Sequence, residues 1–443
     1  MKRPNYHFTP PNNWINDPNG LVYIDGEYHL FYQHYPKDIV WGPMHWGHAV
    51  SMDLLHWEHK EIALYPDELG YIFSGSCIYD RENVSDLGTL SNPPLLAFFT
   101  HHDPDSGRQQ QSIAYSLDKE HFIKYKNNPV IPNAEKKDFR DPKVFENPVK
   151  GGFTMAVAAG CDIEFYHSYD LLTWNKTGSF TPGEHGYGGI CECPDCFPLE
   201  TDEGIQWVLI VSMCLSDEDV LAAIEKGECA SAHMMQYYIG KFDGETFIDM
   251  VCEEKPLMVD FGLDNYAAVT FSNCSQRIML GWGENWNYVK KTPANEYRGK
   301  MTIARKLSLR KTRFGYRLCS EPINSEQFNH GQNISIQNED VIEIKDSSFG
   351  VKIPYISERK VSLFTPCGKK LKIQIEPDKI IVDRSECGVY AVTQDKEILK
   401  KNYDVLYSPR FTPEGGVMKI LFDEGYFEIF AEDGLAVFSL MTF

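Results

Sequence analysis

Hydrophobic and polar residues alternate in short runs along most of the chain, with turn residues between the runs. LVYIDGEYHLFYQ (residues 21–33) contains two alternating runs joined by Asp25 and Gly26, which predicts a β-hairpin with a type I′ turn. VLIVSM and FTMAVAA predict further strands, and helical periodicity is nearly absent. One exception, DEDVLAAIEKGE at 217–228, predicts a short helix inserted between strands. The expected fold class is therefore all-β.

A weak repeat runs through the first three-quarters of the chain. In VSMDLLHW, YSLDKEHF, HSYDLLTW and GKFDGETF an Asp precedes an aromatic residue by four positions, and these acids are Asp53, Asp118, Asp170 and Asp243. A fifth copy is expected to end near MTIARKLSL. Repeats of this length, with about four strands each, are typical of β-propeller blades, because a lone blade cannot bury its faces whereas a closed ring can. The alternative is chance recurrence in an aromatic-rich chain, which the matching strand contexts disfavour.

The composition changes after about residue 330. NHGQNISIQNED is polar and linker-like, and the sequence beyond it alternates in short strands such as LKIQIE, KIIVD and VMKILFD. This pattern predicts a separate β-sandwich. We therefore expect a five-bladed β-propeller over residues 1–325, followed by a short C-terminal β-sandwich over residues 335–443.

Composition and charge narrow the classes of partner. The formal net charge of −20 argues against a nucleic-acid or anionic-membrane partner, because phosphate binding needs clustered Lys and Arg. No run of 18 apolar residues exists to span a membrane. The N-terminus MKRPNYHF has no apolar leader segment, and the twelve Cys follow no regular framework. We expect a cytoplasmic protein with free thiols; a leader removed from the given sequence is the alternative.

Acidic residues recur where the predicted blades begin. The candidate first strands are NDPNGLVYI, FSGSCIYD, FRDPKVFE, CECPDCFPL and DNYAAVTF, and three of them carry an acid near the start: Asp17, Asp141, and Glu192 with Asp195. The first strands of a propeller line its central channel, so these carboxyl groups are expected to converge. Pro follows both Asp17 and Asp141 and predicts extended backbone at each Asp. The alternative is a simple turn, since Asp-Pro-Asn-Gly is also a good turn sequence.

Converging carboxyl groups can perform acid–base chemistry. They repel one another and separate their pKa values, so that one stays ionised while another keeps its proton. Glycoside hydrolysis needs this combination of a nucleophile or base with a general acid. Arg140, beside Asp141, would hold one carboxylate as an anion or bind a sugar hydroxyl.

Other clusters of reactive residues are weaker. Cys191, Cys193 and Cys196 have spacing similar to that of metal ligands, but no second Cys pair or His pair follows at zinc-finger spacing. HHD at 101–103 and HWGH at 45–48 are more typical of loop or core histidines than of metal ligands. P-loop, dinucleotide-binding and G-x-S-x-G motifs are absent. We therefore expect no metal and no cofactor.

The motifs WINDPNG, FSGS, FRDPK and ECPD occur in an order and context that resemble glycoside hydrolase family 32, the β-fructofuranosidases, over about residues 5–320. The resemblance implies a five-bladed propeller followed by a β-sandwich. It implies Asp17 as the nucleophile, Glu192 as the general acid/base and Asp141 as the stabiliser of the transition state. It also implies that eight residues bind the sugar: Asn16, Gln33, Trp41, Phe73, Ser74, Arg140, Tyr266 and Trp282.

The implied activity is retaining hydrolysis of terminal β-D-fructofuranosyl units from fructans or fructo-oligosaccharides, and from sucrose. The Asp17 and Glu192 carboxyl groups are then expected about 5–5.5 Å apart. The alternatives are an invertase or sucrose-6-phosphate hydrolase, a fructosyltransferase, and an inactive fructan-binding propeller. GWGENW and QYYIGKFDGETF resemble the exo-inulinase and levanase branch more closely. Self-association through the C-terminal domain or the insertion at 217–228 is a further hypothesis.

Overall fold

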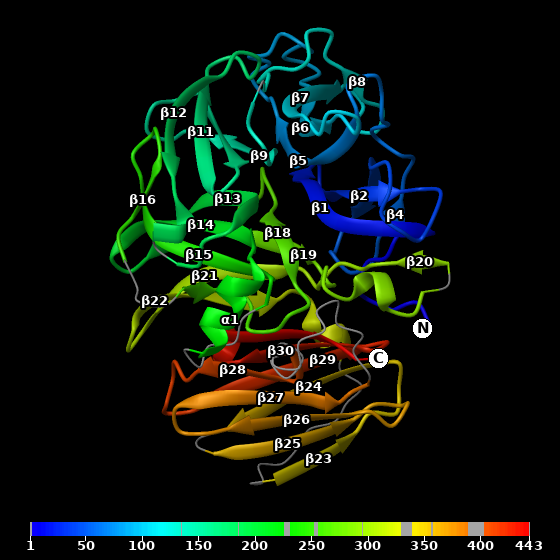
Figure 1. Cartoon of the computed structure of the whole chain (residues 1–443), viewed down its shortest axis with the longest axis vertical. Coiled ribbons are helices and arrows are strands. Elements are labelled where there is room, and N and C mark those ends of the chain that lie inside the picture. The colour runs from blue at the N-terminus through cyan, green and yellow to red at the C-terminus, as the bar shows by residue number, and fades with distance from the viewer. Residues whose placement is uncertain are drawn as a thin grey trace.

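The computed structural model describes residues 2–133, 135–184, 186–225, 231–251, 256–294, 296–328, 339–355, 358–388 and 403–442. β-Strands are the main regular structure of this part of the chain, as the sequence predicts (Figure 1). The predicted helix is α1 (Asp217–Glu225), and residues 226–228 of the prediction lie outside the described residues. No described helix is long and apolar enough to cross a membrane. Four short 3-10 helices are η1 (Pro182–Glu184), η2 (Val289–Lys291), η3 (Ser325–Phe328) and η4 (Glu432–Gly434).

Among the described residues, the N-terminal part of the chain forms five mainly antiparallel sheets, each built mainly from consecutive strands. The first contains β1 (Asn13–Ile24), β2 (Glu27–Tyr35), β3 (His45–Ser51) and β4 (Glu58–His59), with β20 (Tyr297–Arg298) parallel to β1. The second contains β5 (Tyr71–Tyr79), β6 (Leu95–His102), β7 (Gln109–Ser116) and β8 (Ile123–Lys124). The third contains β9 (Phe139–Glu146), β10 (Phe153–Ala159), β11 (Asp162–Ser168) and β12 (Asn175–Phe180).

The fourth and fifth sheets complete this part. The fourth contains β13 (Ile190–Thr201), β14 (Gly204–Cys214), β15 (His233–Phe242), β16 (Phe247–Asp249) and β17 (Leu257–Met258), and α1 connects β14 to β15. The fifth contains β18 (Tyr266–Thr270), β19 (Ile278–Trp282), β21 (Arg305–Thr312) and β22 (Gly315–Pro322). The first strands contact one another in order, β1 to β5, β9, β13 and β18, and β18 contacts β1. The sheets therefore surround a common centre lined by the five strands that the sequence predicts to begin each unit (Figure 1).

The Asp repeat marks the turn between the third and fourth strands of the first four sheets. Each repeat carboxylate accepts hydrogen bonds, 2.7–3.0 Å long, from the backbone N–H groups two and three residues later. The fifth sheet joins β21 to β22 through Arg313 and Phe314 alone, which leaves no room for this motif. The predicted hairpin is also confirmed, because Asp25 and Gly26 both have the positive φ of a type I′ turn, 53° and 93°.

The C-terminal part forms two further sheets. One contains β23 (Glu339–Glu343), β25 (Arg359–Phe364), β26 (Lys370–Ile375), β27 (Lys379–Glu386) and β28 (Val405–Pro409). The other contains β24 (Ser348–Tyr355), β29 (Gly416–Asp423), β30 (Tyr426–Ala431) and β31 (Ala436–Met441). Side chains from both sheets form one hydrophobic core. Most of the predicted linker, residues 329–338, lies outside the described residues, so it stays a prediction.

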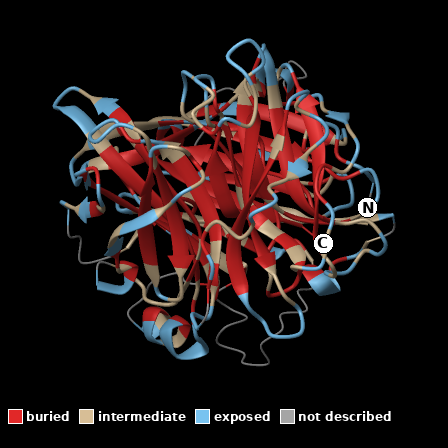
Figure 2. Cartoon of the chain, turned by 90° about the horizontal axis from the view of Figure 1, so that it is seen from above, coloured by how far each residue is buried: buried red, intermediate tan, exposed pale blue. Residues whose placement is uncertain are grey.

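Buried ion pairs join the two parts of the molecule. Arg305 of β21 is fully buried, and its guanidinium lies 2.8 Å from Asp260 and 2.5 Å from Glu428 of β30. Arg384 of β27 pairs with Asp264, directly before β18, at 2.9 Å. Figure 2 shows that burial is continuous through the strands, whereas exposure is concentrated in loops. Because a buried charge that loses its partner is costly, these pairs fix the C-terminal sheets against the fifth sheet.

Candidate active site

All five first strands contain a bulge at the same structural position. In each strand the register with its neighbour shifts so that three steps along the first strand match two steps along its partner. The residues inside the five bulges are 16–17, 73–74, 141–142, 193–194 and 267–268. Bulges turn side chains away from strict alternation and are common beside active sites. Eight of the eleven predicted site residues lie in a bulge or directly before one.

Asp17, in the bulge of β1, is held by two neighbours. Ser74 Oγ of β5 donates a hydrogen bond to Asp17 Oδ2 at 2.6 Å, and Asn16 Nδ2 donates to Oδ1 at 3.0 Å. Asn16 is in turn fixed by the indole N–H of Trp14, which donates to its Oδ1 at 2.7 Å. Both carboxylate oxygens of Asp17 therefore have a defined partner, and its orientation depends on the first and second sheets together.

Asp141, in the bulge of β9, is 6% exposed. Its Oδ2 accepts a hydrogen bond from the backbone N–H of Cys193 at 2.9 Å, and its own N–H donates to Thr100 Oγ1 at 3.0 Å. Its φ is +64°, so the prediction that Pro142 would keep this residue extended is wrong. The left-handed backbone belongs to the bulge, where it is held by contacts to the second and fourth sheets.

Glu192 lies directly before the bulge of β13. Its Oε1 accepts hydrogen bonds from Arg140 Nη2 at 3.1 Å and Nε at 3.3 Å, and its Oε2 accepts one from the hydroxyl of Tyr266 at 2.5 Å. Arg140 is also paired with Asp138 at 2.7 Å and donates to Gln109 at 3.2 Å. The Glu192 side chain is 24% exposed, so it remains accessible while both of its oxygens are positioned.

The three acids influence one another. Burial raises the pKa of Asp17, the charge of Glu192 raises it further, and the hydrogen bonds from Ser74 and Asn16 lower it. Burial raises the pKa of Asp141 to about 7, which the positive charge of Arg140 opposes and the charges of Glu192 and Asp17 reinforce. The pKa values of both aspartates are therefore raised, and the separation of pKa values among the three acids stays a prediction. The separation of about 5–5.5 Å expected between the Asp17 and Glu192 carboxyl groups stays a prediction.

Of the remaining predicted sugar-binding residues, some are accessible to solvent and others are buried. Trp41 is 39% exposed, and its ring meets that of Phe73 edge-on at 6.1 Å. Gln33 is buried and donates to the Ile72 carbonyl at 3.0 Å, which ties β2 to β5 just before its bulge. Trp282 is fully buried against Trp286, with ring centroids 4.8 Å apart. Trp41 and Phe73 thus offer accessible ring surface beside Ser74, whereas Trp282 supports the site from the core.

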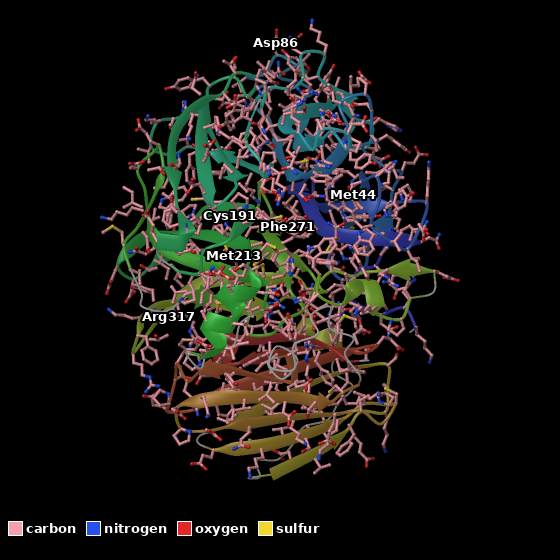
Figure 3. The ribbon with its side chains drawn as sticks, viewed as in Figure 1. Met44, Asp86, Cys191, Met213, Phe271 and Arg317 are labelled. Carbon is pink, nitrogen blue, oxygen red and sulfur yellow. The ribbon has the colours of Figure 1, made fainter. Side chains whose placement is uncertain are left out.

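Several residues that the sequence offered as acids or metal ligands contact other protein side chains. Asp195 is fully buried and pairs with Lys143 at 3.1 Å. Cys191 packs beside Met213 where β13 and β14 pair (Figure 3). His48 contacts His29 at 3.1 Å, and His101 contacts Ser112 at 2.8 Å. Among the described residues, no group of three or more His, Cys, Asp or Glu is placed to hold a metal.

The structure adds residues that the sequence reasoning missed. Cys193 Sγ lies 3.7 Å from Asp17 Oδ2 and 3.5 Å from Asp141 Oδ2, so this thiol stands between the two aspartates. Cys193 lies inside the bulge of β13, directly after Glu192. Asp138 and Gln109 hold Arg140. Asp138 precedes β9 and has a φ of +52°, so strand alternation did not point to it, and Gln109 gave no signal either.

The sequence is similar to that of a known protein family and of several known enzymes. Residues 7–322 match the sequence family described as Glycosyl hydrolases family 32 N-terminal domain. The chain is similar to a levanase of Bacillus subtilis (strain 168), with 39% identity over 98% of this chain and 65% of the levanase. It is also similar to an invertase of Schizosaccharomyces pombe (strain 972), with 37% identity over 70% of this chain and 53% of the invertase. The chain thus spans less than two thirds of the length of both curated relatives.

The fold is similar to that of a solved structure along its whole length. The crystal structure of exo-inulinase from Aspergillus awamori superposes with a TM-score of 0.84 and 27% sequence identity, covering 100% of this chain and 93% of that one. The similarity includes the C-terminal sheets, which lie beyond the family match at 7–322.

Proposed function

The chain belongs to glycosyl hydrolase family 32, and we propose that it is a retaining glycosidase that releases terminal β-D-fructofuranosyl units from fructans or fructo-oligosaccharides, with sucrose as a further substrate. The observation that carries this function is the convergence of three carboxyl groups from three sheets: Asp17 and Asp141 both contact Cys193, and Glu192 is held by Arg140 and Tyr266. The names of the similar proteins, levanase, invertase and exo-inulinase, support a fructosyl unit as the group that is transferred.

The reaction we propose has two displacement steps. Asp17 attacks the anomeric C2 of the terminal fructosyl unit, the bond from C2 to the leaving oxygen breaks, and Glu192 gives its proton to that oxygen. A water molecule then attacks C2 while Glu192 takes its proton, and the bond from C2 to Asp17 breaks to release fructose. Asp141 stabilises the transition state by bonding the fructose hydroxyls. This sequence restores all three groups and retains the anomeric configuration.

Sugar positioning falls to the residues around these acids. Asn16 and Ser74 hold Asp17 and lie close enough to reach the same sugar. Trp41 and Phe73 provide apolar ring surface, which suits the face of a sugar ring. Gln33 and Trp282 support the site from buried positions: Gln33 through its hydrogen bond to β5, and Trp282 through its packing against Trp286. Arg140 is paired with Asp138 and Glu192, so it favours a neutral substrate over a phosphorylated one.

For the architecture, we propose that the five N-terminal sheets are the blades of a five-bladed β-propeller over residues 1–325. The cyclic contacts of the first strands support this arrangement. The two C-terminal sheets, with their shared core, are proposed to be a β-sandwich domain over residues 335–443. Self-association through α1 or the C-terminal sheets stays a prediction, which the mass of the protein in solution tests.

Product analysis by anion-exchange chromatography tests the function. The substrates are sucrose, sucrose-6-phosphate, 1-kestose, inulin and levan, with Asp17→Asn as the inactive control. We expect fructose as the product from the fructans and kestose. Activity confined to sucrose or sucrose-6-phosphate would support the alternative, an invertase or sucrose-6-phosphate hydrolase. Longer products would indicate transfer to an acceptor sugar, and inertness toward every fructoside would contradict the proposal.

A further inference from the structure

A cavity of about 340 Å³ lies outside the cluster of three carboxyl groups. It is lined by residues 2–4, Glu284, residues 292–294, the segment 296–300 around β20, and Glu424 of the C-terminal part. The volume falls within the range of small-molecule sites in proteins, about 300–1,000 Å³. Because the lining comes from both ends of the chain and from its middle, the cavity depends on the assembled fold.

Glu284 is the first sign that this cavity takes a ligand. The residue is 3% exposed, and its Oε1 lies 3.6 Å from the ammonium group of Lys300, itself 4% exposed. Its Oε2 has no hydrogen-bond partner among the described residues. Burial raises the pKa of this carboxyl to about 7. A buried polar oxygen without a partner is costly, and a ligand hydroxyl would satisfy it.

Arg298 supplies a matching donor. Its Nη1 donates to the Val289 carbonyl at 2.6 Å, whereas its buried Nε has no partner within the described part of the chain. Two lining side chains, Glu284 and Arg298, therefore each carry a buried polar atom without a hydrogen-bond partner among the described residues. A ligand that satisfies both must accept a hydrogen bond at one position and donate or accept at another.

The charge of the lining selects the class of ligand. Four basic side chains, including Arg298 and Lys300, face three acidic ones, including Glu284. This balance favours neither a small anion nor a cation. Neighbouring hydroxyl groups can accept from Arg298 and bond to Glu284 without adding charge. We propose that this cavity is a second, non-catalytic binding site for a saccharide unit; the choice of fructose within that class rests on the proposed function.

The cavity is connected to the catalytic acids through β1. Arg298 of β20 is the register partner of Trp14, whose indole N–H donates to Asn16, which in turn donates to Asp17. A saccharide seated on Arg298 is thus separated from the nucleophile by the Trp14 and Asn16 side chains.

Calorimetric titration with fructose tests this site, because fructose is not hydrolysed and the wild-type protein can be used. We expect two fructose molecules per chain in the wild type and one in Glu284→Gln, with crystals soaked in fructose showing sugar in the cavity. Arg298→Met is the second variant, should Glu284→Gln fail to fold, and the same loss is expected. Glu321→Gln removes an exposed carboxyl of β22 outside the lining and should keep both sites.

Inorganic phosphate is the second probe and should leave the cavity empty. One fructose per chain in the wild type, or phosphate seated in the cavity, would overturn the inference. A parallel assay on sucrose separates this outcome from a failure of the proposed function. If sucrose is hydrolysed but only one fructose binds per chain, the binding site in the cavity is refuted and the proposed function stands. If two fructose molecules bind but no fructoside is hydrolysed, the proposed function is refuted and the binding site stands.

Discussion

The carboxylate of Asp141 accepts a hydrogen bond from the backbone N–H of Cys193, with 2.9 Å between Oδ2 and N. This bond joins the bulge of β9 to the bulge of β13. The Cys193 thiol also lies 3.7 Å from Asp17, so one residue of the fourth sheet contacts the acids of two others. The carboxyl groups of Asp17 and Asp141 are therefore positioned by backbone geometry at the bulges as well as by side-chain contacts.

Glu192→Gln should separate the two steps of the reaction. The variant cannot protonate a leaving oxygen, so hydrolysis of sucrose should fall by about 10²–10⁴-fold. An aryl fructoside with a good leaving group needs no such proton, and its first step should be far less affected. Stopped-flow release of the aryl alcohol measures that step. Equal losses on both substrates would remove Glu192 from the role of general acid.

Ser74→Ala should move the acid limb of the pH profile. Asp17 must be ionised to attack, so kcat/KM falls as the pH falls through its pKa. Burial raises that pKa and the Ser74 hydrogen bond lowers it, so removing the hydroxyl should shift the limb to higher pH by about one unit. Ser91→Ala, an exposed site, is the control. An unchanged limb in Ser74→Ala would contradict the assignment of Asp17.

Asp141→Asn should change how stability depends on pH. The folded carboxyl has a pKa of about 7, above the ordinary value near 3.9, so its contribution to stability is present at low pH and is lost as the pH rises through 7. Asn stays neutral, so the variant should gain stability over the wild type at pH 8, by up to roughly 4 kcal/mol, and little at pH 4.

Urea unfolding at the two pH values measures this difference. Asp118→Asn is a control of opposite sign, because the turn hydrogen bonds lower the pKa of that carboxyl. That variant should lose stability at pH 8. If Asp141→Asn were destabilised equally at pH 4 and pH 8, the burial of an uncharged Asp141 in the folded protein would be refuted.

Tyr266→Phe should affect turnover more than substrate binding. The change removes a hydroxyl that donates to Glu192 Oε2 at 2.5 Å but keeps the ring that packs against His233. Hydrogen bonds to charged groups contribute about 1.5–3 kcal/mol, so kcat should fall about 10- to 100-fold with KM little changed. Tyr316→Phe removes a comparable bond to Asp202 on the surface. Equal kinetics for both variants would show that Tyr266 does not position Glu192.

Much of the fold was visible in the sequence because its signals are local. Period-two alternation identified the strands, and the Asp repeat identified turns that depend on one carboxylate and two N–H groups. Three of the five predicted first strands carry Asp17, Asp141 and Glu192, and the cyclic contacts of these strands place them around one centre. The extended backbone predicted for Asp141 failed, because a bulge adds one residue without disturbing the hydrophobic pattern around it.

Other features depend on contacts that no local pattern records. A Trp at position 282 looks the same in the sequence whether it faces a sugar or the core. Only the folded structure shows that it packs against Trp286. The pKa of Asp141 depends on burial by several sheets. The cavity at Glu284 draws its lining from residues 2–4 and Glu424, which are more than 400 positions apart. Such features become visible only in three dimensions.

Trapping the covalent intermediate tests the central claim most directly. Glu192→Gln, treated with an aryl fructoside, should form the fructosyl-enzyme but release it slowly, since no base activates the water. Mass spectrometry of the denatured protein should show one added fructosyl group, and peptide fragmentation should locate it on Asp17. An adduct on another residue, or hydrolysis that inverts the anomeric configuration with no adduct, would contradict the assignment of Asp17 as the nucleophile.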